Sequence, residues 1–372
     1  MAFDERLART LAVMADAGAD IAVLSTVNAM SYVGGYEAPI EVGPSPFAGG
    51  PSTLVVSREG HITLIASNAE QPQPGETRAN SVSAYPGLSS VAHPDSLVDL
   101  YLKAVAHAIP SIRGLTVAVE SDAIPAILGE QLRGHRLVDI TDGLVRARAT
   151  KTAEEIEHLR ECARLVAVGQ RAARDAAKPG RSELEIFARV RCAIETANGS
   201  RLALGGDLLS GPARTAEVMG WPTNRRVGPG DPLLCDLVPR HRGYWGDGCT
   251  TFCIGAPSPG FELLFRACQE ALSQAEAILR PGVVAGVLDS ELRAVLRGHG
   301  FEDPIHMGHA IGVAIHEYPR VVQGETARLE EDMVLMIEPC VRNESLGAVR
   351  LESMFRVTRG GNELMSTYDF SL

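Results

Sequence analysis

Apolar and polar positions along the first 150 residues form short runs whose period switches between that of a helix and that of a strand. Apolar residues recur every three or four positions over residues 4–17, which predicts an amphipathic helix. Continuous apolar runs predict strands, and helical periods lie between them. The predicted strands are 21–24, 53–57, 62–66 and 115–119, and the predicted helices are 96–108 and 123–133. This succession is typical of an α/β domain.

Two segments of this region, 38–51 and 71–86, are rich in residues that favour loops, Pro and Gly among them. Loops of this length often carry function, so walls of a substrate site are one interpretation. A plain surface connection explains the same composition equally well.

From Thr152 onward the periodicity becomes that of long helices. One helix is predicted from Thr152 to about Ala177, where a Pro-Gly pair ends it. The next helix begins with Ser182 as its N-cap and Glu185 in the capping-box position. We therefore predict a domain boundary here, between an N-terminal domain of residues 1–148 and a C-terminal domain of residues 149–372.

The C-terminal domain adds two helical segments, 260–279 and 287–298, and each pair of helices is followed by a hairpin. Helix pair, hairpin, helix pair, hairpin is a duplicated α+β plan. No strong residue-level repeat accompanies it in the sequence.

In the first hairpin, residues 231–252, a strand carrying one carboxylate turns back into a strand carrying another. If the turn is centred between His241 and Arg242, Asp236 and Asp247 lie directly opposite each other and point to the same face. Two such charges on an apolar hairpin repel and lose hydration, so a close pair usually shares a proton or holds a cation. A solvated hairpin with two surface aspartates explains this stretch alone equally well.

The same device recurs near the C-terminus, where a turn centred on Ser345 sets Glu338 opposite Glu352. Between the hairpins lie His309 and His316, seven positions apart, with glycines on either side of the first. Four carboxylates and an imidazole form a hard, oxygen-rich set suited to a pair of Mn, Fe, Co or Zn ions. A lone histidine in an apolar run is more often a core residue, so the prediction rests on the whole set.

Composition limits the classes of protein. A length of 372 residues suggests two domains, and 45% hydrophobic with 22% charged residues is ordinary for a globular protein. No run of about 18 apolar residues offers a membrane span, and a net charge of −11 argues against a nucleic-acid partner. Seven cysteines without a CxxC pair, and a charged first segment unlike a secretory signal, predict buried reduced thiols in a cytoplasmic protein.

The chain resembles the creatinase, prolidase and aminopeptidase P superfamily, whose catalytic domain has the pita-bread fold. Segments 151–160 and 28–35 resemble the start of that catalytic domain and its N-terminal domain. The resemblance implies a pita-bread domain at 149–372, preceded by a smaller α/β creatinase-like domain at 1–148. The five metal positions of the family's peptidases match Asp236, Asp247, His309, Glu338 and Glu352, with the same spacing of eleven between the aspartates.

Three departures accompany this match. The substrate-contacting histidine of the family, seventeen residues before the first aspartate, is replaced by Met219. The run after the second aspartate contains Cys249 and Thr250 where the family has Thr and Arg, and Ser353 replaces the family's Asp after the last ligand. The metal residues are intact while their surroundings are altered, so peptide specificity is the open point.

The resemblance implies a metallopeptidase of the Xaa-Pro aminopeptidase or prolidase type, with two divalent ions, manganese among the candidates, acting on a small peptide substrate. Glu338 would be both ligand and proton shuttle, and His316 would contact the oxyanion or the leaving group. Arg350 lies two residues before Glu352 on the same strand face, where it could orient that carboxylate. Met219 and Arg350 are the residues predicted at the substrate, and His306 is an accessory residue without a clear family counterpart. The family also implies a homodimer.

Two alternatives remain. One is a non-peptide C–N hydrolase or lyase on the same scaffold, creatinase-like, ectoine-hydrolase-like or like the dimethylsulfoniopropionate-cleaving branch. The other is a non-catalytic binding protein. Four clustered carboxylates repel one another without metal, which argues against the second alternative.

Overall fold

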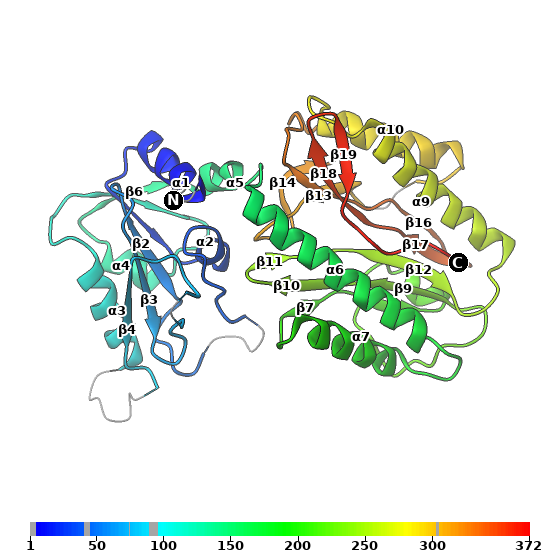
Figure 1. Ribbon diagram of the computed structural model, residues 1–372, viewed down its shortest axis with the longest axis horizontal. Coiled ribbons are helices and arrows are strands. Elements are labelled where there is room, and N and C mark those ends of the chain that lie inside the picture. The colour runs from blue at the N-terminus through cyan, green and yellow to red at the C-terminus, as the bar shows by residue number, and fades with distance from the viewer. Residues whose placement is uncertain (1–4, 41–44, 74, 89–95, 303–304) are drawn as a thin grey trace. The chain divides into compact units, whose positions relative to one another are not determined.

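The computed structural model describes residues 5–40, 45–73, 75–88, 96–302 and 305–372. It contains two compact units, Met1–Arg148 and Ala149–Leu372, each built around cores of its own (Figure 1). Asp4 of the first predicted helix, and residues 41–44 and 74 of the two predicted loops, lie outside the described residues.

The N-terminal unit is an α/β domain built on one six-stranded sheet of order β4-β3-β2-β1-β5-β6. The helices α3 and α4 lie beside this sheet (Figure 1), and their apolar side chains belong to the same core as those of its strands. The strands are β1 (Ile21–Leu24), β2 (Thr53–Ser57), β3 (Ile62–Ser67), β4 (Ser81–Tyr85), β5 (Thr116–Val119) and β6 (Arg136–Asp139). The helices are α1 (Glu5–Asp16), α2 (Val27–Tyr32), α3 (Leu97–Ala108), α4 (Ala126–Gln131) and α5 (Thr141–Ala147).

The sequence prediction missed the two edge strands. β4 lies inside the segment predicted as a loop at 71–86, and β6 had no prediction. Both strands keep most of their residues partly or fully exposed, so neither shows the apolar run by which a strand is recognised. The short helices α2 and α5 were missed as well, being too short to show a helical period.

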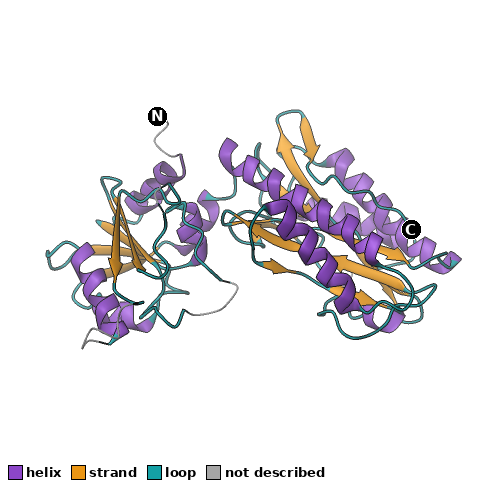
Figure 2. Ribbon diagram, turned by 60° about the horizontal axis from the view of Figure 1, so that its bottom comes forward, coloured by secondary structure: helices purple, strands orange, loops and turns teal. Residues whose placement is uncertain are grey.

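The C-terminal unit has two pairs of long helices that lie over its strands (Figure 2). The side chains of α6 and α7 pack against β8, β9 and β12, and those of α9 and α10 pack against β13, β15 and β18. The helices are α6 (Ala153–Ala176), α7 (Glu183–Asn198), α8 (Pro212–Thr215), α9 (Pro259–Ile278) and α10 (Ala285–Gly298). The capping box at Ser182 and Glu185 is present as predicted.

Four sheets complete this unit, of order β11-β10-β7, β12-β9-β8, β14-β13-β15-β18-β19 and β16-β17. The strands of the first half are β7 (Leu204–Gly205), β8 (Leu208–Ser210), β9 (Pro232–Asp236), β10 (Val238–His241), β11 (Tyr244–Trp245) and β12 (Cys249–Cys253). Those of the second half are β13 (Gly308–Ala310), β14 (Glu317–Val321), β15 (Val334–Ile337), β16 (Cys340–Asn343), β17 (Gly347–Arg350), β18 (Ser353–Thr358) and β19 (Gly361–Leu364).

The duplication extends to single residues, which the sequence did not reveal. The Gly180 N–H donates to the Val227 carbonyl, and 102 positions further on, from 180 to 282 and from 227 to 329, the Gly282 N–H donates to the Leu329 carbonyl. The Arg226 guanidinium caps the Gly180 carbonyl at 2.6 Å, and Arg328 caps Gly282 in the same way at 3.0 Å. The same spacing relates Asp236 to Glu338 and Asp207 to His309.

All seven cysteines are free thiols; six are buried as predicted, whereas Cys192 is exposed on α7. Over the part of the chain that the structure describes, no helix combines the length and the apolar character needed to cross a membrane.

Candidate metal centre

The aspartate hairpin turns one residue later than the sequence suggested. Arg242 and Gly243 both have positive φ, 50° and 83°, and form the two central residues of the turn between β10 and β11. The register therefore pairs Asp236 with Cys249, not with Asp247. Asp247 lies in the short irregular segment before β12.

The glutamate hairpin has the predicted register. Cys340 pairs with Arg350 and Asn343 with Gly347, so the pairing is centred on Ser345. Glu338 and Glu352 follow just beyond the paired residues, where the Leu351 N–H still donates to the Pro339 carbonyl.

Cys249 joins the two hairpins. It pairs with Asp236 on β9, and its own carbonyl accepts a hydrogen bond of 3.0 Å from the Glu352 N–H. From α6, the buried Gln170 amide donates to the Cys235 and Gly248 carbonyls at 2.9 and 2.8 Å. The backbone thus brings both aspartates to Glu352 although the predicted register of the first hairpin was wrong.

The carboxylates of Asp236, Asp247 and Glu352 each present an oxygen within 4.8 Å of the others. His309 completes the set, because its Nε2 lies 3.5 Å from Asp247 Oδ2 and 3.4 Å from Glu338 Oε1. All five predicted ligands are buried and converge on one place in the C-terminal unit.

The chemistry of these side chains fits a bound cation. Asp236 Oδ1, Glu338 Oε1 and Glu352 Oε2 are buried without any hydrogen-bond partner, although unpartnered buried oxygens are costly. Burial, and after it the repulsion of neighbouring carboxylates, raises the pKa of Glu338 and Glu352 well above the usual range. The same two causes raise the pKa of Asp247. A divalent ion would use the orphaned oxygens as ligands and remove this repulsion.

Arg350 is the buried counter-charge of the cluster. Its Nη2 donates to Asp236 Oδ2 at 2.6 Å, and its Nε lies 3.0 Å from Glu352 Oε1. The contact with Glu352 agrees with the orienting role expected from the sequence. The sequence analysis also predicted Arg350 at the substrate. Its side chain is only 4% exposed, which argues against direct contact with a substrate.

Three imidazoles stand beside the carboxylates. The ring of His316 lies 4.1 Å from that of His309, and the ring of His306 lies 5.6 Å from both. Desolvation lowers the pKa of each imidazole from 6.5 to about 4, so all three are neutral at pH 7. His316 is exposed, whereas Nδ1 of His306 lies 3.3 Å from Glu338 Oε1.

Sequence reasoning missed Asp207. Its Oδ2 lies 3.2 Å from Arg350 Nη2, and its Oδ1 accepts the Gly220 N–H at 2.9 Å. Asp207 thus connects the charge network to the loop that carries Met219, whose side chain is 66% exposed. The spacing of 102 residues between Asp207 and His309 was the signal that could have revealed it.

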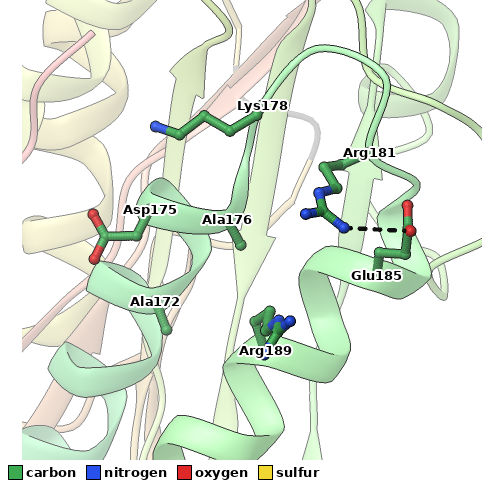
Figure 3. A pocket seen from close by; sticks show the side chains of 7 residues that line it. All are labelled: Ala172, Asp175, Ala176, Lys178, Arg181, Glu185 and Arg189. Carbon is green, nitrogen blue, oxygen red and sulfur yellow. Dashed lines mark ion pairs between the residues drawn. The ribbon is translucent and has the colours of Figure 1, made fainter.

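A separate hollow of about 370 Å³ lies between the end of α6 and the first turns of α7 (Figure 3). Lys178, Arg181 and Arg189 line it together with Asp175 and Glu185, and Arg181 lies 3.5 Å from Glu185. Charges of both signs meet there, and none of the predicted ligands takes part.

Known families and structures resemble the chain over nearly its whole length. Residues 157–359 match the model of metallopeptidase family M24, and residues 6–161 match that of the creatinase/prolidase N-terminal domain. A putative dipeptidase of Bacillus subtilis is 30% identical over 258 residues, 68% of this chain and 71% of that protein. The Xaa-Pro dipeptidase of Lactobacillus helveticus is 30% identical over 264 residues, 69% of this chain and 72% of that protein.

The crystal structure of the prolidase from Pyrococcus horikoshii superposes with a TM-score of 0.83 and covers 99% of both chains at 22% identity. This likeness concerns the fold. Together with the two family matches it confirms the predicted fold class, an α/β N-terminal domain followed by an α+β pita-bread domain.

Proposed function

The chain belongs to metallopeptidase family M24, with a creatinase/prolidase N-terminal domain, and we propose that it is a metal-dependent dipeptidase that hydrolyses Xaa-Pro dipeptides. The observation that carries the proposal is the convergence of four buried carboxylates and one imidazole, in which three of the carboxylates, Asp236, Glu338 and Glu352, each have a buried oxygen without a hydrogen-bond partner. Two relatives of similar length are called dipeptidases, one of them for Xaa-Pro substrates.

Family membership implies dependence on a divalent metal, and we propose two ions held by Asp236, Asp247, His309, Glu338 and Glu352. When bound, such ions acidify a water molecule and polarise the scissile carbonyl. Manganese, iron, cobalt and zinc all suit this mixture of carboxylate and imidazole ligands.

The remaining steps fall to side chains of the site. Glu338 would accept a proton and return it to the leaving amine, because a carboxylate can act in turn as base and as acid. His316, neutral and accessible, donates an N–H to the oxygen that becomes negative or to the leaving group. Arg350 holds Asp236 and Glu352 in place without touching the substrate.

A second candidate is a non-peptide C–N hydrolase or lyase on the same scaffold. The observation that favours it is Met219, a thioether where the family's peptidases carry a substrate-binding histidine. Methionine donates no hydrogen bond and accepts only weakly.

One experiment separates the two candidates. The protein, stripped of metal and reconstituted with Mn²⁺, Co²⁺, Fe²⁺ or Zn²⁺, is tested on Xaa-Pro dipeptides and on N-acyl and guanidino compounds, and its metal content is measured. We expect close to two ions per chain and turnover of the dipeptides. Turnover of the other compounds alone would favour the second candidate, and absence of bound metal under saturating conditions would contradict both.

We further infer a homodimer and a cytoplasmic location. The family resemblance supports the dimer, and the unpaired cysteines support a reducing compartment. Light scattering that finds only monomers at micromolar concentration would contradict the dimer.

A further inference from the structure

The loop Val218–Trp221 presents the two most exposed large apolar side chains among the described residues. Trp221 is 84% and Met219 is 66% exposed. A single exposed apolar residue needs no explanation, but tryptophan side chains are on average largely buried, so an exposure this high is unusual. Two such side chains on one short loop suggest a binding surface.

This loop is held firmly at both ends. The Val218 carbonyl accepts from Arg350 Nη1 at 3.1 Å, and the Trp221 carbonyl accepts from Arg214 Nη2 at 2.8 Å. The fully buried Glu183 accepts from both the N–H and the hydroxyl of Thr223, at 2.8 and 2.7 Å. The exposure of Met219 and Trp221 therefore reflects an ordered backbone.

Val218 is strained within this loop. Its φ is +61°, a conformation that is an outlier for a β-branched residue. Such strain persists only where the surroundings impose it, most often at functional sites.

The loop is also tied to the metal ligands. Arg350, which donates a hydrogen bond to the Val218 carbonyl, contacts Asp236 and Glu352 with the same guanidinium. Asp207 adds a second tie, because it binds both Arg350 and the Gly220 N–H. Met219 therefore lies between two backbone groups that are hydrogen-bonded to the network around the carboxylates.

We propose that Met219 and Trp221 bind the apolar side chain of the N-terminal residue of the substrate, with Asp207 as the positioning residue of their loop. The inference rests on the proposed Xaa-Pro dipeptidase function. Proline is common to all these substrates, so an apolar surface beside the site selects among them by the variable side chain. Thioether and indole surfaces suit flexible and flat apolar groups.

The test compares Gly-Pro, Ala-Pro, Leu-Pro and Phe-Pro in the unmutated enzyme and in Trp221→Ala. We expect kcat/KM of the unmutated enzyme to favour Leu-Pro and Phe-Pro over Gly-Pro by about tenfold, and Trp221→Ala to reduce this ratio to about twofold. Leu263→Ala is the matched control, because Leu263 is 50% exposed on α9, and it should keep the full ratio. An unchanged ratio in Trp221→Ala would overturn the proposal. If the variant also changed its oligomeric state, measured as molecular mass by light scattering, Trp221 would instead belong to a contact between subunits.

Asp207→Asn tests the positioning role. The amide keeps an acceptor for the Gly220 N–H but loses the charge that pairs with Arg350. We expect KM for Leu-Pro to rise several-fold, about five, with a smaller change in kcat and a reduced Leu-Pro to Gly-Pro ratio. A parallel loss on all dipeptides, with the ratio intact, would assign Asp207 a structural role only and overturn this part.

A fluorescence measurement separates this proposal from the proposed function. The chain has two tryptophans, so Trp245→Phe leaves Trp221 as the only reporter. Leu-Pro and Gly-Pro analogues with the scissile carbonyl reduced to methylene cannot be hydrolysed. A blue shift of Trp221 emission with the Leu-Pro analogue, and none with the Gly-Pro analogue, is the expected result even in an enzyme without dipeptidase activity. Equal spectra for both would overturn the proposal.

Discussion

Substitutions at Glu338 and Asp247, two of the proposed metal ligands, test the proposed chemistry most directly. Glu338→Gln and Asp247→Asn keep the shape of each side chain but remove a negative charge that a cation requires. We expect each change to lower kcat/KM by more than about 100-fold. Mutation of a residue that only supports a metal ligand already lowers metal affinity or activity by about 10–100-fold. Mass spectrometry of the bound metal should show reduced occupancy in the same variants.

Glu344→Gln is the matched control for these two changes. Glu344 lies in the turn of the glutamate hairpin, which also carries Glu338, but it is exposed. Its substitution should leave metal content and activity unaltered. Full activity of Glu338→Gln would contradict its role as ligand and proton carrier.

Met219 gives a prediction with the opposite sign. A histidine there would restore a hydrogen-bond donor beside the substrate, and a single donor that acts in the transition state is worth about 10²–10³ in rate. We expect Met219→His to raise Xaa-Pro cleavage, and Met219→Leu, which keeps the apolar surface, to give no gain. Turnover of about 10 per second by the unmutated enzyme, typical of enzymes in general, with no gain in Met219→His would show that no donor is missing.

At the level of elements, the two hairpins show what the sequence could and could not predict. The turn around Ser345 lies between regular strands, so counting from its centre gives the true register. In the first hairpin Arg242 lies in the turn with a positive φ. Arginine rarely adopts a positive φ, so the sequence gives no sign that the turn is at this position. A one-residue shift resulted, and the ligand set survived because Asp247 lies outside the regular pairing.

Residues that act through tertiary contacts were less accessible to sequence reasoning. Arg350 was placed on the face of Glu352 correctly, but its burial and its contact with Asp236 depend on a strand from the other hairpin. Asp207 follows two glycines in a segment without apolar periodicity, so nothing local marks it. Local patterns therefore predicted most helices and the five buried side chains that converge in the structure, while the hydrogen-bond network around those side chains could be seen only in the fold.

Gln170 joins α6 to the aspartate hairpin, and its removal should destabilise the domain. The buried amide donates to the Cys235 and Gly248 carbonyls and accepts from the Thr250 hydroxyl at 2.7 Å. Gln170→Leu would leave these groups without partners, and we expect a loss of about 2–4 kcal/mol in the free energy of unfolding by urea. Gln269→Leu on the exposed side of α9 is the control and should change stability by less than about 0.5 kcal/mol. A loss below about 1 kcal/mol in Gln170→Leu would show that water replaces the amide.

For the molecule as a whole, the duplication explains why the site lies where it does. Two similar halves bring equivalent positions together, so that Asp236 and Glu338, 102 residues apart, both reach the carboxylate cluster. The halves have diverged at another pair of equivalent positions, 207 and 309. The first half has Asp207, which binds Arg350, and the second half has His309, which faces Asp247. The half that contains His309 thus supplies the imidazole that we propose as a ligand, and the half that contains Asp207 supplies the hydrogen bond to the Met219 loop.

Packing four carboxylates together also makes stability depend on pH and metal. In the metal-free protein the raised pKa values of Asp247, Glu338 and Glu352 mean that the folded state holds protons which the unfolded chain releases near pH 4. Their contribution to stability is therefore present at low pH and is lost as pH rises toward the folded pKa values. The three imidazoles act in the opposite sense, but only between about pH 4 and the ordinary value of 6.5.

Between about pH 7 and about pH 8 the imidazoles no longer contribute, and the carboxylates and the buried thiols of Cys235 and Cys249, whose pKa burial raises, all act in the same direction, so the sign of the effect is fixed. We expect Tm of the metal-free protein to fall over this range. Saturating Mn²⁺ should raise Tm at each pH and flatten the slope, since a ligand that binds only the folded state stabilises it by about 2.7 kcal/mol at 100 times its Kd. Calorimetry of the chelator-treated and Mn²⁺-saturated protein at matched pH makes the comparison. A metal-free Tm that rises with pH over this interval would mean that the carboxylates are already compensated within the chain, and the case for a cation at this site would lose its electrostatic basis.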